Sequence, residues 1–225
     1  NNMLYTNLYQ VNATYPINEV KSIRATIGLR SDRGVLKSYD NIAGQPNPNA
    51  LAYQDTVSKF VLSRIEYVHD NTINPTQNIW NGLRYKVYLD VNMPTLKTAL
   101  NNGKPTMNFG FDGRYYHKIY RNFIWAGRVA ADFSWGNQKL IYYLGGVDGW
   151  IGPKFNNGNQ PAADQNYAFQ SLAVNMRGYR QNIANGNNAF VINSEFRLPL
   201  FATIFDRPIN NAFLRNFQLV QFLDL

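Results

Sequence analysis

The sequence predicts an all-β protein, an antiparallel up-and-down β-barrel that crosses a membrane. Apolar residues recur with a period of two far more often than with the helical period of ~3.6 residues. The alternating runs extend over about 9 to 13 residues, which is the length of a membrane strand, whereas soluble strands usually have five or six. Aromatic residues make up 15% of the 225 residues and charged residues only 16%. Soluble domains contain about 25% charged residues, so the composition also favours a membrane barrel.

Eight segments carry the alternation and are expected to be strands. Four alternate cleanly: 23–30, 83–93, 107–116 and 123–135. In the second of these, the odd positions from Leu83 to Met93 are apolar or aromatic, and most even positions are polar or charged. Four further segments are less regular: 4–15, 57–69, 188–200 and 213–225. One face of each strand would meet lipid, and the charged face would line the lumen.

The connections between these segments alternate between short and long, as they do in up-and-down membrane barrels. Residues 16–21 and 120–122 form short connections and 70–82 a longer one, all expected on the periplasmic side. The long connections 37–55, 94–106 and 136–187 are rich in Asn, Gly and Pro and are expected outside. Aromatic residues near strand ends fit the two interfacial girdles of a membrane barrel: Tyr15, Trp80, Tyr115, Phe123 and Trp135.

A soluble β-sandwich that acts as a binding module is the main structural alternative, because its strands also alternate. Alternation does not tell the inner face from the outer face. Strand length and the low content of charged residues therefore favour the membrane barrel over the soluble β-sandwich. No run approaches ~18 consecutive apolar residues, which excludes a membrane-spanning helix.

Catalytic and cofactor chemistry find little support in the sequence. The chain has no cysteine, and His69 and His117 lie on different expected strands without the spacing of metal ligands. Ser134 near Asp132 is more simply lumen lining than a nucleophile. The glycine-rich run at 145–149 lacks the Gly-Lys-Ser/Thr that follows in a phosphate loop. The net charge of +8 is spread singly over the strands, so nucleic-acid binding is not expected.

Ordered motifs in the second half of the chain are the most informative feature. They are Tyr143-Leu144-Gly145-Gly146, Met176-Arg177-Gly178-Tyr179, Asn-Ser-Glu-Phe-Arg-Leu-Pro-Leu at 193–200 and Phe-Gln-Leu-Val-Gln-Phe-Leu-Asp at 217–224. Upstream lie Tyr67-Val68-His69-Asp70-Asn71, Pro75 and Asn81-Gly82. This series resembles the C-terminal barrel of the BamA/TamA-like outer-membrane protein insertase and two-partner-secretion transporter superfamily, also called the bacterial surface antigen family.

The resemblance implies that residues 1–225 are a partial outer-membrane barrel domain. About eight strands of a roughly sixteen-strand barrel would be present, with roughly five strands before Asn1, three after Leu225 and the periplasmic domains outside this chain. It further implies that the 136–187 connection folds back into the lumen. The motif Arg177, Gly178 and Tyr179 would form the tip of that loop.

By the same resemblance, Arg177 reaches acidic groups on the inner wall, which correspond to Glu195 and Asp224. A guanidinium offers a planar fork of donors that two carboxylates satisfy well. The alternatives are a solvated Arg177 and a local pair between Glu195 and Arg197 on the same strand face. Asp224 shares its face with Val220 and Phe222, so an inward Asp224 requires a bulge or an apolar patch in the lumen.

The function implied is that of an integral outer-membrane barrel of a Gram-negative bacterium that takes part in outer-membrane protein assembly or polypeptide translocation, without enzymatic activity, nucleotide or cofactor. Its expected partners are outer-membrane lipid and lipopolysaccharide, and unfolded polypeptide clients or other outer-membrane proteins. Two alternatives stay open: a channel or porin-like uptake barrel, and a barrel that anchors a fused periplasmic accessory domain.

Overall fold

The expected all-β class is confirmed by the computed structural model, in which antiparallel strands dominate and the two helices are short. The residues that the structure describes are 2–36, 41–42, 45–46, 54–73, 81–96, 103–136, 139–146, 155–160, 167–173, 176–205, 207 and 209–225. Trp80 and Pro75 lie outside them. Within these residues, no helix has the length and apolar character needed to cross a membrane.

One eight-stranded antiparallel sheet forms most of the structure. Each strand pairs with its neighbour in the chain, and the spatial order is β1 (Asn2–Asn18), β2 (Lys21–Leu36), β5 (Gln54–Asp70), β6 (Gly82–Pro94), β7 (Thr106–Tyr120), β8 (Phe123–Gly136), β12 (Asn188–Pro199) and β13 (Gln218–Asp224). Each of the eight expected strands is present. Within the described ranges no pairing joins β1 to β13, so the sheet is not closed into a barrel.

The smaller elements lie in the long connections. The 136–187 connection contains β9 (Lys139–Leu144), β10 (Tyr167–Leu172) and β11 (Ala184–Gly186), which form a three-stranded sheet with β9 in the middle. A two-stranded sheet pairs β3 (Asn41–Ile42) with β4 (Gln45–Pro46). The sequence pattern did not predict these short strands, because the long connections lack a clear apolar alternation.

Two expected strands are shorter than the sequence predicts. The strand expected over 188–200 ends at Pro199, because α1 (Leu200–Ile204) starts directly after it. The strand expected over 213–225 begins only at Gln218, because its first residues belong to α2 (Ala212–Asn216). The side chain of Asn211 caps this helix by accepting hydrogen bonds from the backbone N–H groups of Phe213 and Leu214. A local cap thus overrides the apolar alternation that predicted a strand.

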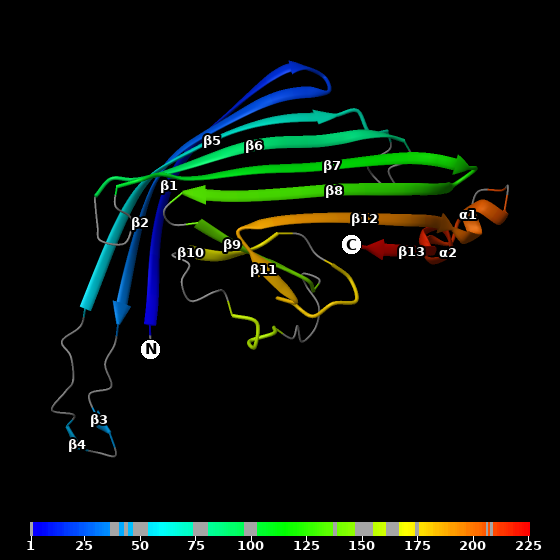
Figure 1. The fold of residues 1–225 in the computed structure, drawn as a ribbon. Coiled ribbons are helices and arrows are strands. Elements are labelled where there is room, and N and C mark those ends of the chain that lie inside the picture. Colours follow the sequence, from blue (N-terminus) through cyan, green and yellow to red (C-terminus); the bar gives the residue numbers. More distant parts are fainter. Residues whose placement is uncertain are drawn as a thin grey trace.

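The main sheet is strongly curved, and β9, β10 and β11 lie on its concave side, next to β8 and β12 (Figure 1). The concave face carries most of the polar residues. Strand register aligns Arg24, Glu66, Tyr88, Gly110 and Asp132 in one row across β2, β5, β6, β7 and β8.

The convex face is apolar and exposed. Its side chains alternate with those of the concave face on every strand, and those with large exposed fractions include Tyr9 at 75%, Val11 at 75%, Ile27 at 65%, Phe190 at 58% and Ile65 at 56%. The aromatic residues Tyr15, Tyr115 and Trp135 are exposed as well. The main sheet therefore turns its polar side toward the described part of the 136–187 connection, and no described residues cover its apolar side.

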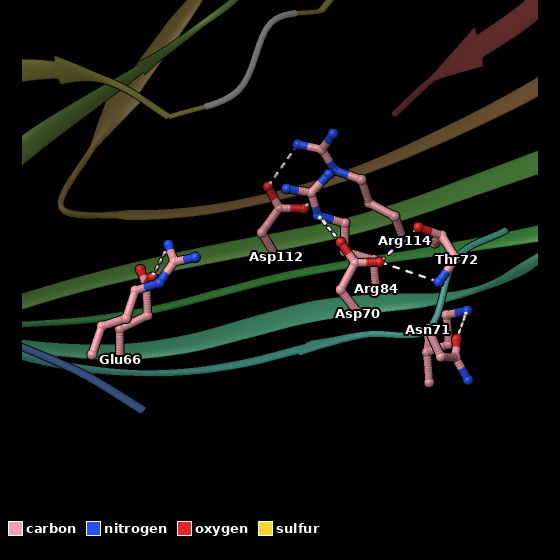
Figure 2. Close-up of polar contacts among 9 residues, drawn as sticks. Glu66, Asp70, Asn71, Thr72, Arg84, Asp112 and Arg114 are labelled. Atoms are coloured by element: carbon pink, nitrogen blue, oxygen red, sulfur yellow. Dashed lines mark hydrogen bonds and ion pairs between the residues drawn. The ribbon is translucent and has the colours of Figure 1, made fainter. Parts of the chain in front are cut away.

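Side chains of Asp70 and Asn71 make hydrogen bonds where β5 ends and β6 begins (Figure 2). Asn71 Oδ1 accepts a hydrogen bond from the backbone N–H of Leu83 at 2.7 Å, and Asp70 Oδ1 accepts from the N–H and hydroxyl of Thr72. Gly82 adopts a φ of +126° directly against the backbone of Thr72, where a Cβ atom would lie only 2.7 Å from Thr72 Cα. This position therefore requires glycine.

Candidate functional site

Arg177 is held against the concave wall by two acidic residues from neighbouring strands. Its Nε and Nη2 donate to the two carboxylate oxygens of Asp224 at 3.0 and 2.8 Å, and its backbone N–H donates to the same carboxylate at 2.8 Å. Its Nη1 lies 2.5 Å from Glu195 Oε1. The structure thus brings together the three residues that the resemblance singled out, Arg177 from the loop and the two acids from β12 and β13.

Burial makes these contacts strong. The side chain of Asp224 is only 1% exposed, that of Glu195 18% and that of Arg177 27%. The hydrogen bonds to Asp224 are the largest cause of a raised pKa for Arg177, which stays protonated at any physiological pH. We call Arg177, Asp224 and Glu195, together with Phe222, the Arg177 anchor.

Phe222 explains how an acidic residue and apolar residues share one face of β13. The Arg177 guanidinium carbon lies 4.1 Å from the centroid of the Phe222 ring, which is the geometry of a cation–π contact. The register between β12 and β13 is regular from Asn193 to Pro199, so no bulge is needed there. By the sequence pattern, Asp224 can point inward only with a bulge or an apolar patch. The structure has an apolar residue, Phe222, on this face and a regular register without a bulge.

Two further side chains complete the surroundings of the anchor. The amide of Asn193 donates to Asp224 Oδ1 at 2.9 Å. Arg197 pairs with Glu195 through Nη2 at 2.7 Å, so Glu195 is shared between Arg197 and Arg177. The local pair considered from sequence therefore coexists with the long-range one. The role of Asn193 was missed, although it lies two residues from Glu195 on the same strand face.

Backbone contacts of a Gly-Gly turn hold the loop tip. The N–H of Gly146 donates to the carbonyl of Tyr179 at 3.0 Å, and the N–H of Met176 donates to the carbonyl of Gly146 at 3.1 Å. Gly178 has a φ of +85° with open space around it, so glycine is needed there for backbone conformation alone. Tyr179 is 47% exposed. The turn and the Arg-Gly-Tyr segment form one unit on the concave wall.

Asparagine side chains substitute for regular secondary structure in the same loop. The buried amide of Asn182 donates to the carbonyls of Asn156 and Asn159 at 2.9 and 2.7 Å. Asn159 in turn donates to the carbonyls of Asn182 and Ile183. These residues were missed as contributors to the site, and the high Asn content of the loop was the available signal.

Ser134 fastens the start of the loop to the wall. Its hydroxyl donates to Asn108 Oδ1 at 2.7 Å and accepts from the backbone N–H of Leu140 at 2.8 Å. Asp132 accepts instead from the Tyr88 hydroxyl at 2.5 Å. The two residues therefore serve in separate contacts of the concave face.

Ion pairs cross the concave face between neighbouring strands (Figure 2). Asp112 accepts from Arg114 at 3.1 Å and from Arg128 at 2.7 Å, each through two nitrogen atoms. Glu66 bridges Arg24 and Arg64 at 3.3 and 3.1 Å. Arg84 lies 3.4 Å from Asp70. Many charged side chains of the concave face are thus paired with side chains of opposite charge.

The Tyr88 ring lies against Gly110, and its hydroxyl reaches Asp132 on β8. A Cβ atom at Gly110 would collide with the Tyr88 ring. The ring is also covered by the Arg64 guanidinium at 4.0 Å from its centroid. Gly110 therefore provides the gap through which Tyr88, on β6, contacts Asp132, on β8.

Substitution of Gly110 by alanine is expected to destabilise the folded sheet by about 1–3 kcal/mol, because the added methyl group displaces the Tyr88 ring and its hydrogen bond. Urea titration of the refolded protein measures this. Gly113→Ala, on the same strand but opposite face, is the control, since the three atoms nearest to the added methyl group there belong to the end of the Phe111 ring, which carries no hydroxyl group held by a hydrogen bond. If Gly110→Ala adds a further loss on top of Tyr88→Leu, the clash with Tyr88 is not the cause.

The histidines lie in aromatic contacts on two different strands. His69 stacks on Tyr85 with ring centroids 5.1 Å apart, and His117 on Tyr115 at 6.2 Å. In the part of the chain that the structure describes, no group of three or more His, Cys, Asp or Glu residues is arranged to hold a metal ion.

Comparison with known proteins gives no match to this chain, either among models of protein families or among curated proteins. The function must therefore be inferred from the chain's own residues. The two features with most information are the two-faced sheet and the Arg177 anchor.

Proposed function

We propose that this chain forms part of the wall of an integral outer-membrane β-barrel of the BamA/TamA-like insertase and two-partner-secretion superfamily. In this role the barrel takes part in outer-membrane protein assembly or in polypeptide translocation. The convex face contacts lipid, the concave face lines the lumen, and the 136–187 connection lies inside. The observation that carries the proposal is the Arg177 anchor on the polar side of a sheet whose apolar side is exposed.

The distribution of the two faces supports a membrane location. In a soluble sandwich the apolar face of a sheet packs against a second layer, and the polar face meets water. Here the only layer present among the described residues covers the polar face, while Val11 and Ile27 on the other side are more than half exposed. An apolar surface of this extent is stable only when lipid or protein covers it.

The anchored loop favours the function of an insertase or translocator over that of an open uptake channel. A long connection that is bound to the wall by charge-assisted hydrogen bonds occupies the lumen and restricts diffusion through it. Such a loop has more contacts than a simple constriction requires, because Asp224, Glu195 and Phe222 all engage one arginine. The anchor therefore serves to fix the loop's position.

Depletion of the full-length protein tests the proposed function. We expect lower amounts of other outer-membrane barrels, or retention of secreted proteins, measured by quantitative proteomics of the outer-membrane and culture fractions. Complementation with the wild-type protein is expected to restore barrel assembly and secretion. Arg180 is an exposed arginine in the same loop, so complementation with Arg180→Ala is the matched control for Arg177→Ala. Normal barrel assembly and normal secretion after depletion would contradict the proposal.

A further inference from the structure

The connection between β12 and β13, residues 200–217, holds a cluster of aromatic side chains, some of which are largely exposed. The connection contains α1 and α2, each five residues long, and lies at the end of β12 (Figure 1). The connection is seated on the turn between β7 and β8, where Arg121 donates to the carbonyl of Thr203 at 3.1 Å and Asn122 to that of Ala202 at 2.7 Å. The cluster therefore has a defined position at one end of the sheet.

Aromatic rings in this connection pack against one another. Phe201 contacts Phe205 and Phe217 with ring centroids 6.4 and 5.5 Å apart, and Phe213 contacts Phe217 at 6.0 Å. Even so, Phe213 is 72% exposed and Phe205 54% exposed. Parts of these rings therefore stay exposed in spite of their mutual contacts. We call these four residues the phenylalanine cluster.

Two exposed arginines, Arg207 and Arg215, lie in the connection, and Arg121 lies on the supporting turn. The connection also contains one acidic residue, Asp206, which lies outside the described residues, and its basic residues are in excess. The apolar convex face reaches the same end of the sheet, where Phe123 and Phe196 stack at 5.8 Å. Exposed aromatic rings flanked by arginines, next to an apolar sheet face, form the surface that inserts into the headgroup region of a bilayer.

We infer that the phenylalanine cluster is an interfacial anchor that binds a phospholipid surface with anionic headgroups. The phenyl rings lie among the upper acyl carbons, and Arg207 and Arg215 contact the phosphates. This inference rests on the proposed membrane location and adds to it a second, separate membrane contact at one end of the strands. Helices of this length gain little stability alone, so binding at the interface also orders the connection.

Site-directed spin labelling tests the anchor. The 225 residues contain no cysteine, so one introduced cysteine carries a nitroxide without competition from this chain. Phe213→Cys is labelled in the full-length protein and reconstituted into phosphatidylcholine–phosphatidylglycerol vesicles. Collision of the label with oxygen, which concentrates in lipid, is compared with collision with a water-soluble nickel complex. Because Phe213 is 72% exposed, this substitution is expected to leave the main sheet intact.

Reference labels on β1 give the scale. Val11→Cys lies on the convex face and Gln10→Cys on the concave face, and both positions are exposed. The Phe213→Cys label is expected to show an oxygen-to-nickel collision ratio several-fold above that of Gln10→Cys and below that of Val11→Cys. Replacing Arg207 and Arg215 by Gln is expected to lower this ratio in anionic vesicles and to leave it unchanged in vesicles of phosphatidylcholine alone.

Each other outcome overturns a specific statement. A water-accessible Phe213→Cys label beside a lipid-accessible Val11→Cys label would refute the anchor and leave the proposed function standing. Water accessibility at both sites would refute the membrane location itself. A Phe213→Cys label shielded from both oxygen and nickel would show that protein, rather than lipid, covers the phenylalanine cluster.

Discussion

Replacing Arg177 by alanine is expected to release the 136–187 connection from the concave wall and to destabilise the folded protein by about 3–5 kcal/mol. The reason is that Asp224, whose side chain is 1% exposed, is left as a buried carboxylate without its cation. Urea titration of the refolded protein measures the stability. Limited proteolysis measures the release, because cleavage within the connection should become faster than cleavage within the strands.

Two variants separate the anchor from a general effect of charge. Arg177→Lys keeps the charge but loses the planar fork, so an intermediate loss is expected. Arg180→Ala removes an exposed arginine three positions away and is expected to change stability by less than about 0.5 kcal/mol. Equal effects of Arg177→Ala and Arg180→Ala would refute the anchor. A large, stable channel conductance that is the same with and without Arg177→Ala would favour a porin-like barrel instead.

Lysine at Val11 and lysine at Gln10 are expected to differ strongly, although the two residues are adjacent on β1 and both exposed. Val11 points to the convex face near the middle of its strand. If that face contacts lipid, a charge there costs about 2–4 kcal/mol, whereas Gln10→Lys on the concave face should be nearly neutral. Folding of each variant into vesicles, followed by urea titration, gives the two free energies.

This pair distinguishes a membrane sheet from a soluble one. In water, an exposed valine on a strand tolerates lysine with little change in stability, so Val11→Lys and Gln10→Lys would then behave alike. Fractionation of the full-length protein gives an independent answer. Recovery in the soluble periplasm would contradict the membrane location, and extraction from membranes only by detergent is the expected result.

The strands were predictable because each depends on a local pattern. A period of two places Ile23, Ile27 and Leu29 on one face whatever the neighbouring strand is, so strand existence follows from short stretches of sequence. Strand ends were less predictable. The strand predicted from the apolar alternation included Phe213 and Leu214, but the Asn211 side chain caps a helix there by accepting hydrogen bonds from their backbone N–H groups.

The site was predictable only in part. Arg177, Glu195 and Asp224 were selected by resemblance. In the chain, Glu195 follows Arg177 by 18 residues and Asp224 follows it by 47 residues, so a local pattern could not show that they meet. Asn193 and Phe222 were not selected, since an amide beside an acid and an aromatic ring on a strand are common. Their roles depend on where the loop lies.

The sequence by itself determined the all-β class, the eight strands and the alternation of two chemically different faces, because side-chain direction along a strand is set by the backbone geometry of each residue. Only the tertiary structure decided which face is concave, how Phe222 and Asp224 share an arginine, and where the phenylalanine cluster lies. These depend on contacts between residues far apart in the chain, on sheet curvature and on loop closure, which no local pattern encodes.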